Sequence, residues 1–600
     1  MSVESTVKSG GEDGKFCRLG RSGGGSTERR NSHPADRYAM VWTVMPDFEG
    51  YDEARDQFSW DLPASYNPAV DFLQKHDDPD RVALEQAYPD GRREQYTFRE
   101  LDELSDRLAA GLAGLGVEAG DRVGVVVPQK PQNPITHLAN WKLGAVSVPL
   151  TVLFGTDALR YRLDDAGATA AVIDPAVRDD IDAVRDDCPA LEHVVEIETD
   201  APASDVHAFE DVLAAPEHTD IEPYESTPDT DTAILYTSGS TGPPKGVRHA
   251  HALWLGRAAA AYNFFDQGLG PDATVWTPAD WAWGAALGGT LFATWHHGGT
   301  IVGYPASGFD AEEAFSLLSE FGVTRSFMPA TALRMLMDVE NPTAAYDLAI
   351  ETFAVGGESL TPEIVDWVAE TFDSVTINEF YGQTELNLVV ANNSNWFDTQ
   401  PGSMGKPLPG YDLTILDPDA ADRGVAEPLS TGVLGEIALR PHDRSVFFDE
   451  YWNMPDKTAA KEVEGWFVTG DLARRDDDGY VWFKSRKDDV IITSGYRVGP
   501  MEVESAILEH SDVVQAGVIG VPDDTRGEII KAYVEAAEDA PNHDTLRTEI
   551  RSVVREGLAE YEYPREIEFA DTLPQTTSGK IRRKELQEWN ADDSAAGGPP

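Results

Sequence analysis

The chain has 600 residues, more than one hydrophobic core accommodates, so at least two domains are expected. It carries 105 Asp and Glu against 48 Lys and Arg, a formal net charge of −57 spread along its whole length. This charge argues against nucleic acid or an anionic membrane as a partner, because surfaces that bind phosphate are basic. It indicates adaptation to a high-salt cytoplasm, where salt screens the self-repulsion, as in a halophile.

Two cysteines, Cys17 and Cys188, are too few for a disulfide framework and do not have metal-ligand spacing. No apolar run approaches the roughly 18 residues of a membrane span, and the N-terminus lacks an apolar signal segment. These features predict a cytoplasmic protein. The oligomeric state is left open.

Residues 1–45 are rich in Gly, Ser and Arg and are expected to form a disordered leader. Leucines then recur at three- and four-residue steps from Leu101 to Leu115, which predicts an amphipathic helix. The apolar segment 121–128 predicts a strand. Helical and short apolar segments alternate onward, with further strands expected at 172–173, 193–197, 300–302, 325–328 and 352–355. Such alternation predicts an α/β domain built on a largely parallel sheet.

The pattern changes twice in the second half of the chain. From Leu413 to Leu439 it becomes rich in strands and turns, and a last strand is expected at 479–484. A polar break at 485–489 precedes a smaller unit of helices and strands. We therefore expect a domain over residues 46–487, a second over 488–589 and a disordered tail over 590–600.

The segment from Tyr236 to Val247 follows an apolar run and is rich in glycine and hydroxyl groups. Glycines let the backbone approach a ligand closely, hydroxyls add donors, and Lys245 adds a positive charge. The loop therefore suits a polyphosphate. It is not a Walker A loop, because Gly246 follows Lys245 where that motif needs Ser or Thr. Its candidate binding residues are Thr237, Ser238, Gly239, Ser240, Thr241 and Gly242.

A second motif, Tyr381-Gly382-Gln383-Thr384-Glu385, offers a carboxylate and a hydroxyl. Glu385 is a candidate Mg²⁺ ligand, since Mg²⁺ prefers carboxylate and phosphate oxygens together. Thr384 is a candidate donor to an α-phosphate. The alternative interpretation is a helix start, with Thr384 as the cap and Glu385 at the positive end of the helix.

These motifs closely resemble the signatures of the adenylate-forming superfamily, which includes acyl-CoA synthetases, and the resemblance spans roughly Tyr51 to Glu588. Within the superfamily, the motifs of this chain look most like those of the medium-chain acyl-CoA synthetases. The resemblance implies a large N-terminal domain with mostly parallel sheets and a β-rich subdomain, and a small, mobile C-terminal α+β domain. It also implies ATP, Mg²⁺ and coenzyme A as reactants and cofactors.

The resemblance assigns further residues to the nucleotide and CoA. Gly357, Glu358 and Ser359 would face one side of adenine and Tyr381 the other, while Asp471 would accept both ribose hydroxyls. Arg486 matches the family's ribose-binding arginine beside the interdomain hinge, although Ser485 replaces the usual glycine. The remaining nucleotide and CoA contacts implied are Gly382, Gln383, Gly495, Tyr496, Arg497 and Arg555.

The segment Thr576-Thr577-Ser578-Gly579-Lys580 resembles the family's catalytic-lysine loop. Lys580 is a mobile charge that can bridge the acid oxygen and the α-phosphate in the transition state. The catalytic candidates are thus Lys580, Thr384, Glu385 and Lys245.

The predicted reaction joins a short- or medium-chain fatty acid, or an aryl acid, to CoA through an acyl-adenylate. Acetate-specific relatives place a tryptophan where this chain has Gly382, so the acyl pocket is expected to be open. Three further functions fit the same motifs: an acetyl-CoA synthetase, an adenylating enzyme that loads a carrier protein, and a nucleotide-binding protein without turnover.

Overall fold

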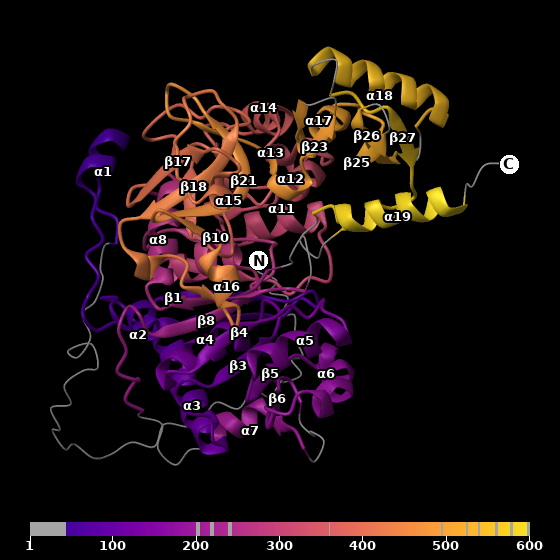
Figure 1. The fold of residues 1–600 in the computed structure, drawn as a ribbon. Coiled ribbons are helices and arrows are strands. Elements are labelled where there is room, and N and C mark those ends of the chain that lie inside the picture. The colour runs from indigo at the N-terminus through magenta and orange to yellow at the C-terminus, as the bar shows by residue number, and fades with distance from the viewer. Residues whose placement is uncertain are drawn as a thin grey trace, which may run out of the picture.

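The structure is a computed structural model that describes residues 44–199, 205–215, 221–237, 243–358, 360–493, 496–523, 526–537, 540–558, 562–575 and 580–596. Four sheets organise these residues. In Figure 1 the strands β3 to β6 lie at the bottom, β17, β18 and β21 lie above them, and the C-terminal strands and helices project at the upper right.

An eight-stranded sheet carries the first motif. Its inner strands pair in parallel, and β8 and β9 form an antiparallel pair beside them. The strand order is β19 (Glu450–Tyr451), β9 (Gly246–Ala250), β8 (Asp231–Tyr236), β4 (Val146–Pro149), β3 (Arg122–Val126), β5 (Ala170–Ile173), β6 (His193–Glu196) and β7 (His207–Ala208).

A nine-stranded sheet carries the second motif at the end of β14. Parallel pairing runs from β1 through β14, and antiparallel strands flank it on both edges. The order is β16 (Lys406–Pro407), β15 (Leu388–Ala391), β14 (Thr376–Gly382), β13 (Thr352–Gly356), β12 (Arg325–Phe327), β10 (Thr274–Trp276), β11 (Thr300–Gly303), β1 (Val82–Ala87) and β2 (Arg93–Thr97).

The two smaller sheets are largely antiparallel. The first contains β17 (Tyr411–Leu416), β18 (Gly435–Pro441), β20 (Glu462–Val463), β21 (Trp466–Arg475) and β22 (Val481–Arg486). The second contains β23 (Ile491–Thr493), β24 (Tyr496–Val498), β25 (Val513–Asp523), β26 (Gly527–Ala536) and β27 (Glu566–Phe569). The chain passes from one sheet to the other through a 3-10 turn at Lys487–Asp489.

Helices cover the sheets. The longer ones are α3 (Phe98–Leu115), α4 (Gln132–Leu143), α5 (Thr156–Ala166), α8 (Leu253–Phe264), α11 (Ala311–Glu320), α14 (Pro362–Thr371), α18 (His543–Gly557) and α19 (Arg583–Ala596). Shorter ones are α1 (Tyr51–Gln57), α2 (Pro68–Gln74), α6 (Arg178–Val184), α7 (Phe209–Ala214), α9 (Gly284–Ala286), a π-helix (Leu287–Phe292), α10 (Ala293–His296), α12 (Ala330–Met337), α13 (Pro342–Ala345), α15 (Ala420–Arg423), α16 (Pro455–Ala459) and α17 (Pro500–Leu508).

The sequence explains α3 at both ends. Thr97 and Glu100 form a reciprocal capping box at its N-terminus, and Gly116 ends it with φ of +106°, a left-handed conformation that favours glycine. Its leucine stripe faces a core shared by the two large sheets. Aromatic rings fill the centre of that core. The ring centres of Trp141 and Trp254 lie 5.1 Å apart, and the Phe292 ring packs against both.

Most predicted elements are confirmed. The helix at 101–115 is α3, and the expected strands appear as β3, β5, β6, β11, β12, β13 and β22. The fold class is confirmed. The alternating pattern predicted a largely parallel sheet, and the structure contains two large sheets with parallel strands at their centres. The expected tail at 590–600 needs correction, because α19 continues to Ala596. Trp589 packs against the Tyr533 ring, and Asn590 accepts a hydrogen bond from Lys531 at 3.0 Å, which anchors this part of the helix.

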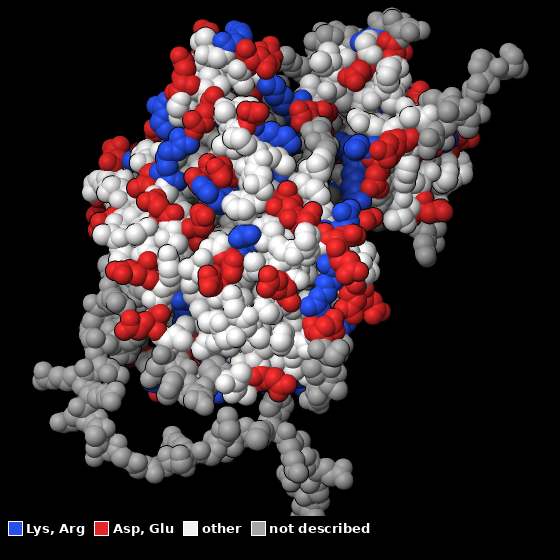
Figure 2. Space-filling view, turned by 60° about the horizontal axis from the view of Figure 1, so that its bottom comes forward, with Lys and Arg blue, Asp and Glu red and all other residues white. Residues whose placement is uncertain are grey.

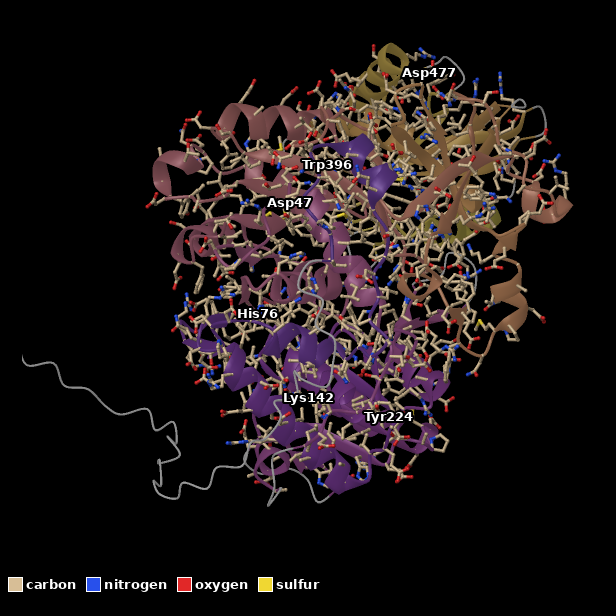
Figure 3. The ribbon with its side chains drawn as sticks, turned by 90° about the vertical axis from the view of Figure 1, so that its left-hand side faces the viewer. Asp47, His76, Lys142, Tyr224, Trp396 and Asp477 are labelled. Atoms are coloured by element: carbon tan, nitrogen blue, oxygen red, sulfur yellow. The ribbon has the colours of Figure 1, made fainter. Side chains whose placement is uncertain are left out.

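Acidic side chains are distributed over the face in Figure 2 and do not gather in one patch. Figure 3 shows Lys142 and Tyr224 in the lower part of the molecule, where the Tyr224 N–H donates to the Lys142 carbonyl at 2.7 Å. Among the helices of the described ranges, none has the length and apolar character needed to cross a membrane.

Candidate active site

The first motif connects β8 to β9. The Thr237 N–H donates to the carbonyl of Lys245 at 3.0 Å, which closes the base of the connection. Ser238, Gly239, Ser240, Thr241 and Gly242 lie outside the described residues. The antiparallel pairing of β8 and β9 therefore fixes the positions of Thr237, directly after β8, and Lys245, directly before β9.

Lys245 and Glu385 are connected through Tyr451. The Tyr451 hydroxyl donates to Glu385 Oε1 at 2.7 Å, and Lys245 Nζ lies 3.4 Å from the same hydroxyl and 4.4 Å from the ring centre. Burial lowers the pKa of Lys245, and the Glu385 carboxylate opposes this shift. Tyr451 reaches the site because β19 pairs with β9.

The second motif ends β14, and no helix follows it: the chain bends at Thr384 and enters β15. The helix-start interpretation of Thr384 and Glu385 is therefore wrong. The Thr384 carbonyl accepts a hydrogen bond from His249 Nε2 at 2.8 Å. Burial lowers the pKa of His249 to about 3, so the imidazole is neutral at physiological pH.

Asp471 is contacted by side chains from two segments, the end of β14 and the end of β22. Its Oδ2 accepts from the Tyr381 hydroxyl at 2.7 Å and from Gln383 Nε2 at 2.5 Å, and Arg486 Nε lies 3.1 Å from Oδ1. Burial raises the pKa of Asp471, and Arg486 counteracts that rise. Asp471 lies within β21, and Gly470 before it has φ of +82°, a conformation that favours glycine.

Gly357 and Glu358 follow β13, where Gly357 has φ of +85°. Glu358 Oε2 accepts hydrogen bonds from the N–H and the hydroxyl of Thr331 at the start of α12, at 3.0 and 2.9 Å. These bonds fix the glutamate beside the strand end. Ser359 lies outside the described residues.

Lys580 comes from the C-terminal part of the chain and reaches this strand end. A side-chain carbon placed on Gly357 would lie 3.8 Å from Lys580 Nζ. The residue as a whole is exposed, while its ammonium end is desolvated. That desolvation lowers the pKa of Lys580, and the nearby carboxylates of Glu358 and Asp471 oppose the shift. The structure thus brings Lys580 together with Gly357, Glu358 and Asp471.

Other expected contacts lie apart from this cluster or outside the described residues. Arg555 is on α18, where its guanidinium stacks 4.3 Å from the Tyr563 ring centre, and the structure does not place it with Asp471. Tyr496 and Arg497 belong to β24, and Gly495 lies outside the described residues. Their assignment to the nucleotide or to CoA stays a prediction.

Gly382 does not provide an open slot. A side-chain carbon there would lie 2.5 Å from the Asn387 carbonyl oxygen and 2.9 Å from Leu388 Cδ2. The antiparallel entry of β15 places this backbone against Gly382. The expected widening of the acyl pocket at this residue is therefore wrong, because the space is already filled by the chain itself.

Two contributing residues were not identified from the sequence, Tyr451 and Lys461. Lys461 Nζ donates to the carbonyls of Val468 and Thr469, at 3.3 and 3.1 Å, just before Asp471. Burial lowers the pKa of Lys461, and Glu385 opposes that shift. The only local signal was a lysine shortly before the Thr469-Gly470-Asp471 motif.

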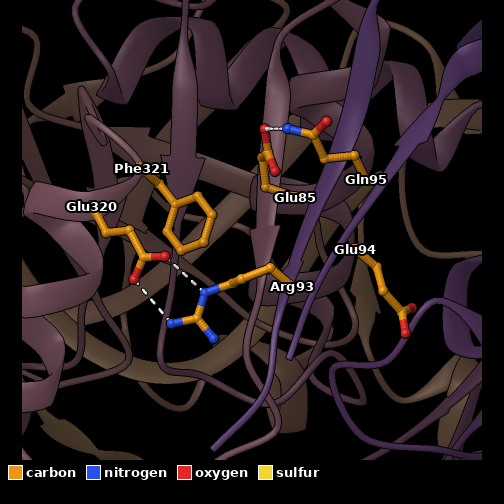
Figure 4. Close-up of a pocket in the computed structure, with 6 residues that line it drawn as sticks. All are labelled: Glu85, Arg93, Glu94, Gln95, Glu320 and Phe321. Atoms are coloured by element: carbon orange, nitrogen blue, oxygen red, sulfur yellow. Dashed lines mark hydrogen bonds and ion pairs between the residues drawn. The ribbon is translucent and has the colours of Figure 1, made fainter. Parts of the chain in front are cut away.

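A separate pocket lies on β1, β2 and α11, away from these motifs (Figure 4). Arg93 pairs there with Glu320 at 2.7 Å, and Gln95 donates to Glu85 at 2.8 Å. Because its charged groups already have partners, this pocket does not compete with the motif cluster as the candidate site.

Similarity to known proteins extends over most of the chain. The model of the AMP-binding enzyme family matches residues 73–450, and that of the AMP-binding enzyme C-terminal domain matches 502–580. The chain is 36% identical to the acetyl-coenzyme A synthetase of Bacillus subtilis, covering 92% of this chain and 98% of the relative. It is 32% identical to acyl-coenzyme A synthetase ACSM3 of Mus musculus, covering 92% and 96%.

Among solved structures, the anthranilate CoA ligase AuaEII in complex with anthranoyl-AMP is similar, with a TM-score of 0.80 and 28% identity. The similarity covers 89% of this chain and 99% of that one. Family models, relatives and structure thus agree over nearly the whole described chain. The chain belongs to the AMP-binding enzyme family.

Proposed function

We propose that the protein is an ATP-dependent, AMP-forming acid:CoA ligase. The observation that carries this proposal is the position of Lys580, beside Gly357 and within the electrostatic reach of Glu358 and Asp471. A cation from the C-terminal part and carboxylates from the N-terminal part meet where a nucleotide would bind. This arrangement suits adenylation, in which charge develops between an acid and an α-phosphate.

Each residue has a defined role in the first half-reaction. A carboxylate oxygen of the acid attacks the α-phosphorus of ATP, and the bond to pyrophosphate breaks. Lys580 and Thr384 would stabilise the α-phosphate oxygens, and Lys245 with its loop would hold the departing pyrophosphate. Asp471 would accept the ribose hydroxyls, and Arg486 would hold Asp471 in place through its 3.1 Å ion pair.

Glu385 fits a magnesium ion. One of its oxygens accepts from Tyr451, and within the described residues no hydrogen bond reaches the other. The described residues contain no cluster of three or more metal-ligating side chains, which suits Mg²⁺ held by one carboxylate together with phosphate oxygens and water. When bound, the ion would neutralise phosphate charge.

In the second half-reaction the thiol of CoA attacks the acyl carbonyl, and AMP leaves as the thioester forms. No protein nucleophile is needed, and the described cysteine, Cys188, is buried. Rotation of residues 488–589 about the turn at Lys487–Asp489 would withdraw Lys580 and admit the thiol. Gly495, Tyr496, Arg497 and Arg555 are the proposed contacts after this rotation.

The acid proposed is a short- or medium-chain fatty acid or an aryl acid. Because the chain itself fills the space beside Gly382, this residue does not favour longer acids, and acetate stays a candidate substrate. The net charge of −57 supports a halophilic, cytoplasmic setting in which salt screens repulsion. Two competing functions are the loading of a carrier protein and nucleotide binding without turnover.

One assay separates these functions. AMP release would be measured in molar KCl with acids from acetate to dodecanoate and with benzoate, each with and without CoA. CoA-dependent AMP release with any of these acids supports the ligase. Acid-dependent adenylation that does not depend on CoA points to the loading of a carrier protein. A failure to release AMP with any of the acids contradicts the proposal.

A further inference from the structure

His249 joins the two large sheets at the candidate site. It lies on β9, where it pairs with Ala233 of β8, and it is fully buried. From this eight-stranded sheet, its Nε2 donates to the carbonyl of Thr384 at 2.8 Å. Thr384 follows β14 of the nine-stranded sheet. One imidazole therefore links the strand after the phosphate loop to the backbone of the second motif.

The backbone of Thr384 depends on this hydrogen bond. Thr384 lies in a bend between β14 and β15, outside the paired residues of both strands. Within the described residues, no other hydrogen bond to its backbone is formed. Its two neighbours are held through their side chains, since Gln383 donates to β21 and Glu385 accepts from Tyr451. His249 is thus the group that fixes Thr384 itself.

His249 has one hydrogen to donate, and that hydrogen lies on Nε2. Burial, together with the nearby charge of Arg257, lowers the pKa of His249 to about 3, so the ring is neutral near pH 7. A neutral imidazole carries a single N–H, and the 2.8 Å contact with a carbonyl oxygen requires it on Nε2. Nδ1 is buried without a hydrogen-bond partner in the described chain. A ring held in this way does not act as a base, so its role is to hold Thr384.

Strand β9 also carries the other anchors of the site. It begins directly after Lys245, and its Val247 pairs with Tyr451, which donates to Glu385. One strand therefore sets the spacing between the Lys245 ammonium, the Glu385 carboxylate and the Thr384 backbone. In a reaction that depends on such positioning, an error of about 1 Å costs up to about 100-fold in rate.

We propose that His249 is a positioning residue for adenylation, whose Nε2–H fixes the Thr384 backbone so that the Thr384 hydroxyl meets the α-phosphate of ATP. This inference rests on the proposed ligase function and deepens it. Thr384 is partly exposed, and no hydrogen bond from the described residues reaches its hydroxyl, so that group is available to a ligand. Without the imidazole, the Thr384 carbonyl loses its donor and the bend is free to shift.

The experiment measures acid-dependent exchange of pyrophosphate into ATP in molar KCl, with acids from acetate to dodecanoate and with benzoate. His249→Leu removes the donor, and His249→Gln keeps an N–H donor. His251→Leu is the matched control, because His251 is equally buried and its Nδ1 lies 3.3 Å from the Tyr66 carbonyl oxygen, outside the candidate site. Thr384→Val, alone and combined with His249→Leu, completes a double-mutant cycle. Circular dichroism checks folding.

His249→Leu should lower kcat for the exchange by about tenfold or more and leave KM for ATP within about twofold of wild type, because the other nucleotide contacts remain. His249→Gln should recover part of the loss, and His251→Leu should show none. In the Thr384→Val background, His249→Leu should lower kcat by no more than about twofold, because the hydroxyl that it positions is already absent.

An unchanged kcat in a folded His249→Leu overturns the inference, as do losses that add fully in the double variant or an equal loss in His251→Leu. Undiminished exchange in Thr384→Val also overturns it, whether or not His249→Leu folds. These outcomes leave the exchange by the wild type, and with it the adenylating half of the proposed function, standing. Absence of acid-dependent exchange in the wild type with every acid refutes the proposed function and the inference with it.

Discussion

Tyr451 connects two charged groups of the candidate site, Lys245 and Glu385. Its hydroxyl donates to Glu385 Oε1 at 2.7 Å, and its ring centre lies 4.4 Å from the Lys245 ammonium. The three residues are far apart in the sequence and meet because β19 pairs with β9 at the edge of the eight-stranded sheet. One tyrosine thus orients both the proposed magnesium ligand and the proposed pyrophosphate-binding lysine.

Tyr451→Phe should weaken use of magnesium and ATP while leaving the fold intact. The ring and its contact with Lys245 are kept, but Glu385 loses a hydrogen bond worth about 1.5 kcal/mol or more to a charged group. We expect kcat/KM for ATP to fall by about tenfold, with a higher magnesium concentration needed for half-maximal rate. Initial rates over a magnesium series would measure both.

Tyr262→Phe is the matched control for this variant. Its hydroxyl also donates to a carboxylate, that of Asp47 at 2.6 Å, outside the candidate site. An equal fall in kcat/KM in both variants would mean that Tyr451 acts only on general stability.

Glu379 should make stability depend on pH. It is buried on β14, two residues before Tyr381, and its Oε2 accepts from the Leu360 N–H at 3.3 Å. Burial raises its pKa from 4.5 to about 8. The folded state therefore favours the protonated form, so its stabilising contribution is complete below about pH 4.5 and is lost as the pH rises to about 8.

Glu379→Gln removes this titration and keeps the shape. Its free energy of unfolding relative to wild type should therefore increase steadily between pH 5 and pH 8, which urea denaturation in molar KCl would measure. A difference between the two proteins that stays constant over this range would contradict the assignment to Glu379.

The sequence could predict the elements and the motif residues, but only part of their arrangement. The leucine stripe of α3 and the apolar strands are local patterns, and glycine-rich strand ends mark where ligands bind. Tyr451 and Lys461 could not be found this way, because strand pairing, and not local periodicity, brings them into place. The pairing of β19 with the distant β9 brings Tyr451 to Glu385, and the hairpin of β20 and β21 folds Lys461 back to Thr469.

One alternative interpretation and one expectation were wrong for the same reason. Pairing with β14 makes residues 388–391 the strand β15, so no helix starts at Thr384 and Glu385. That pairing also fills the space beside Gly382, which local sequence reasoning treated as open.

Arg583 should hold the Lys580 segment in place. Its guanidinium pairs with Glu504 of α17 at 2.6 Å and with Asp489, beside the proposed hinge, at 3.3 Å. Arg583→Met would leave the buried Glu504 carboxylate without a cation, lowering the free energy of unfolding by about 3 kcal/mol. Denaturation measured with a C-terminal probe should detect this. Arg583→Lys should lose less stability. A denaturation midpoint equal to that of the wild type in both variants would contradict this role of Arg583.

Salt should stabilise the protein strongly. With a net charge of −57, repulsion between surface carboxylates falls as the Debye length shrinks from about 10 Å at 0.1 M salt to about 3 Å at 1 M. We expect the melting temperature to rise steeply with KCl. NaCl at equal ionic strength separates screening from a specific effect of potassium, and a melting temperature that does not change with either salt would refute the prediction.

The most direct test of the proposed chemistry measures the two half-reactions separately in Lys580→Ala. Acid-dependent exchange of pyrophosphate into ATP should fall by about 100-fold or more, because Lys580 stabilises the adenylation transition state. Thioester formation from added acyl-adenylate and CoA should persist within about threefold of wild type. Lys584→Ala, at an exposed lysine on α19 just after Lys580, should affect neither. Equal loss of both half-reactions, or undiminished exchange, would contradict the role assigned to Lys580.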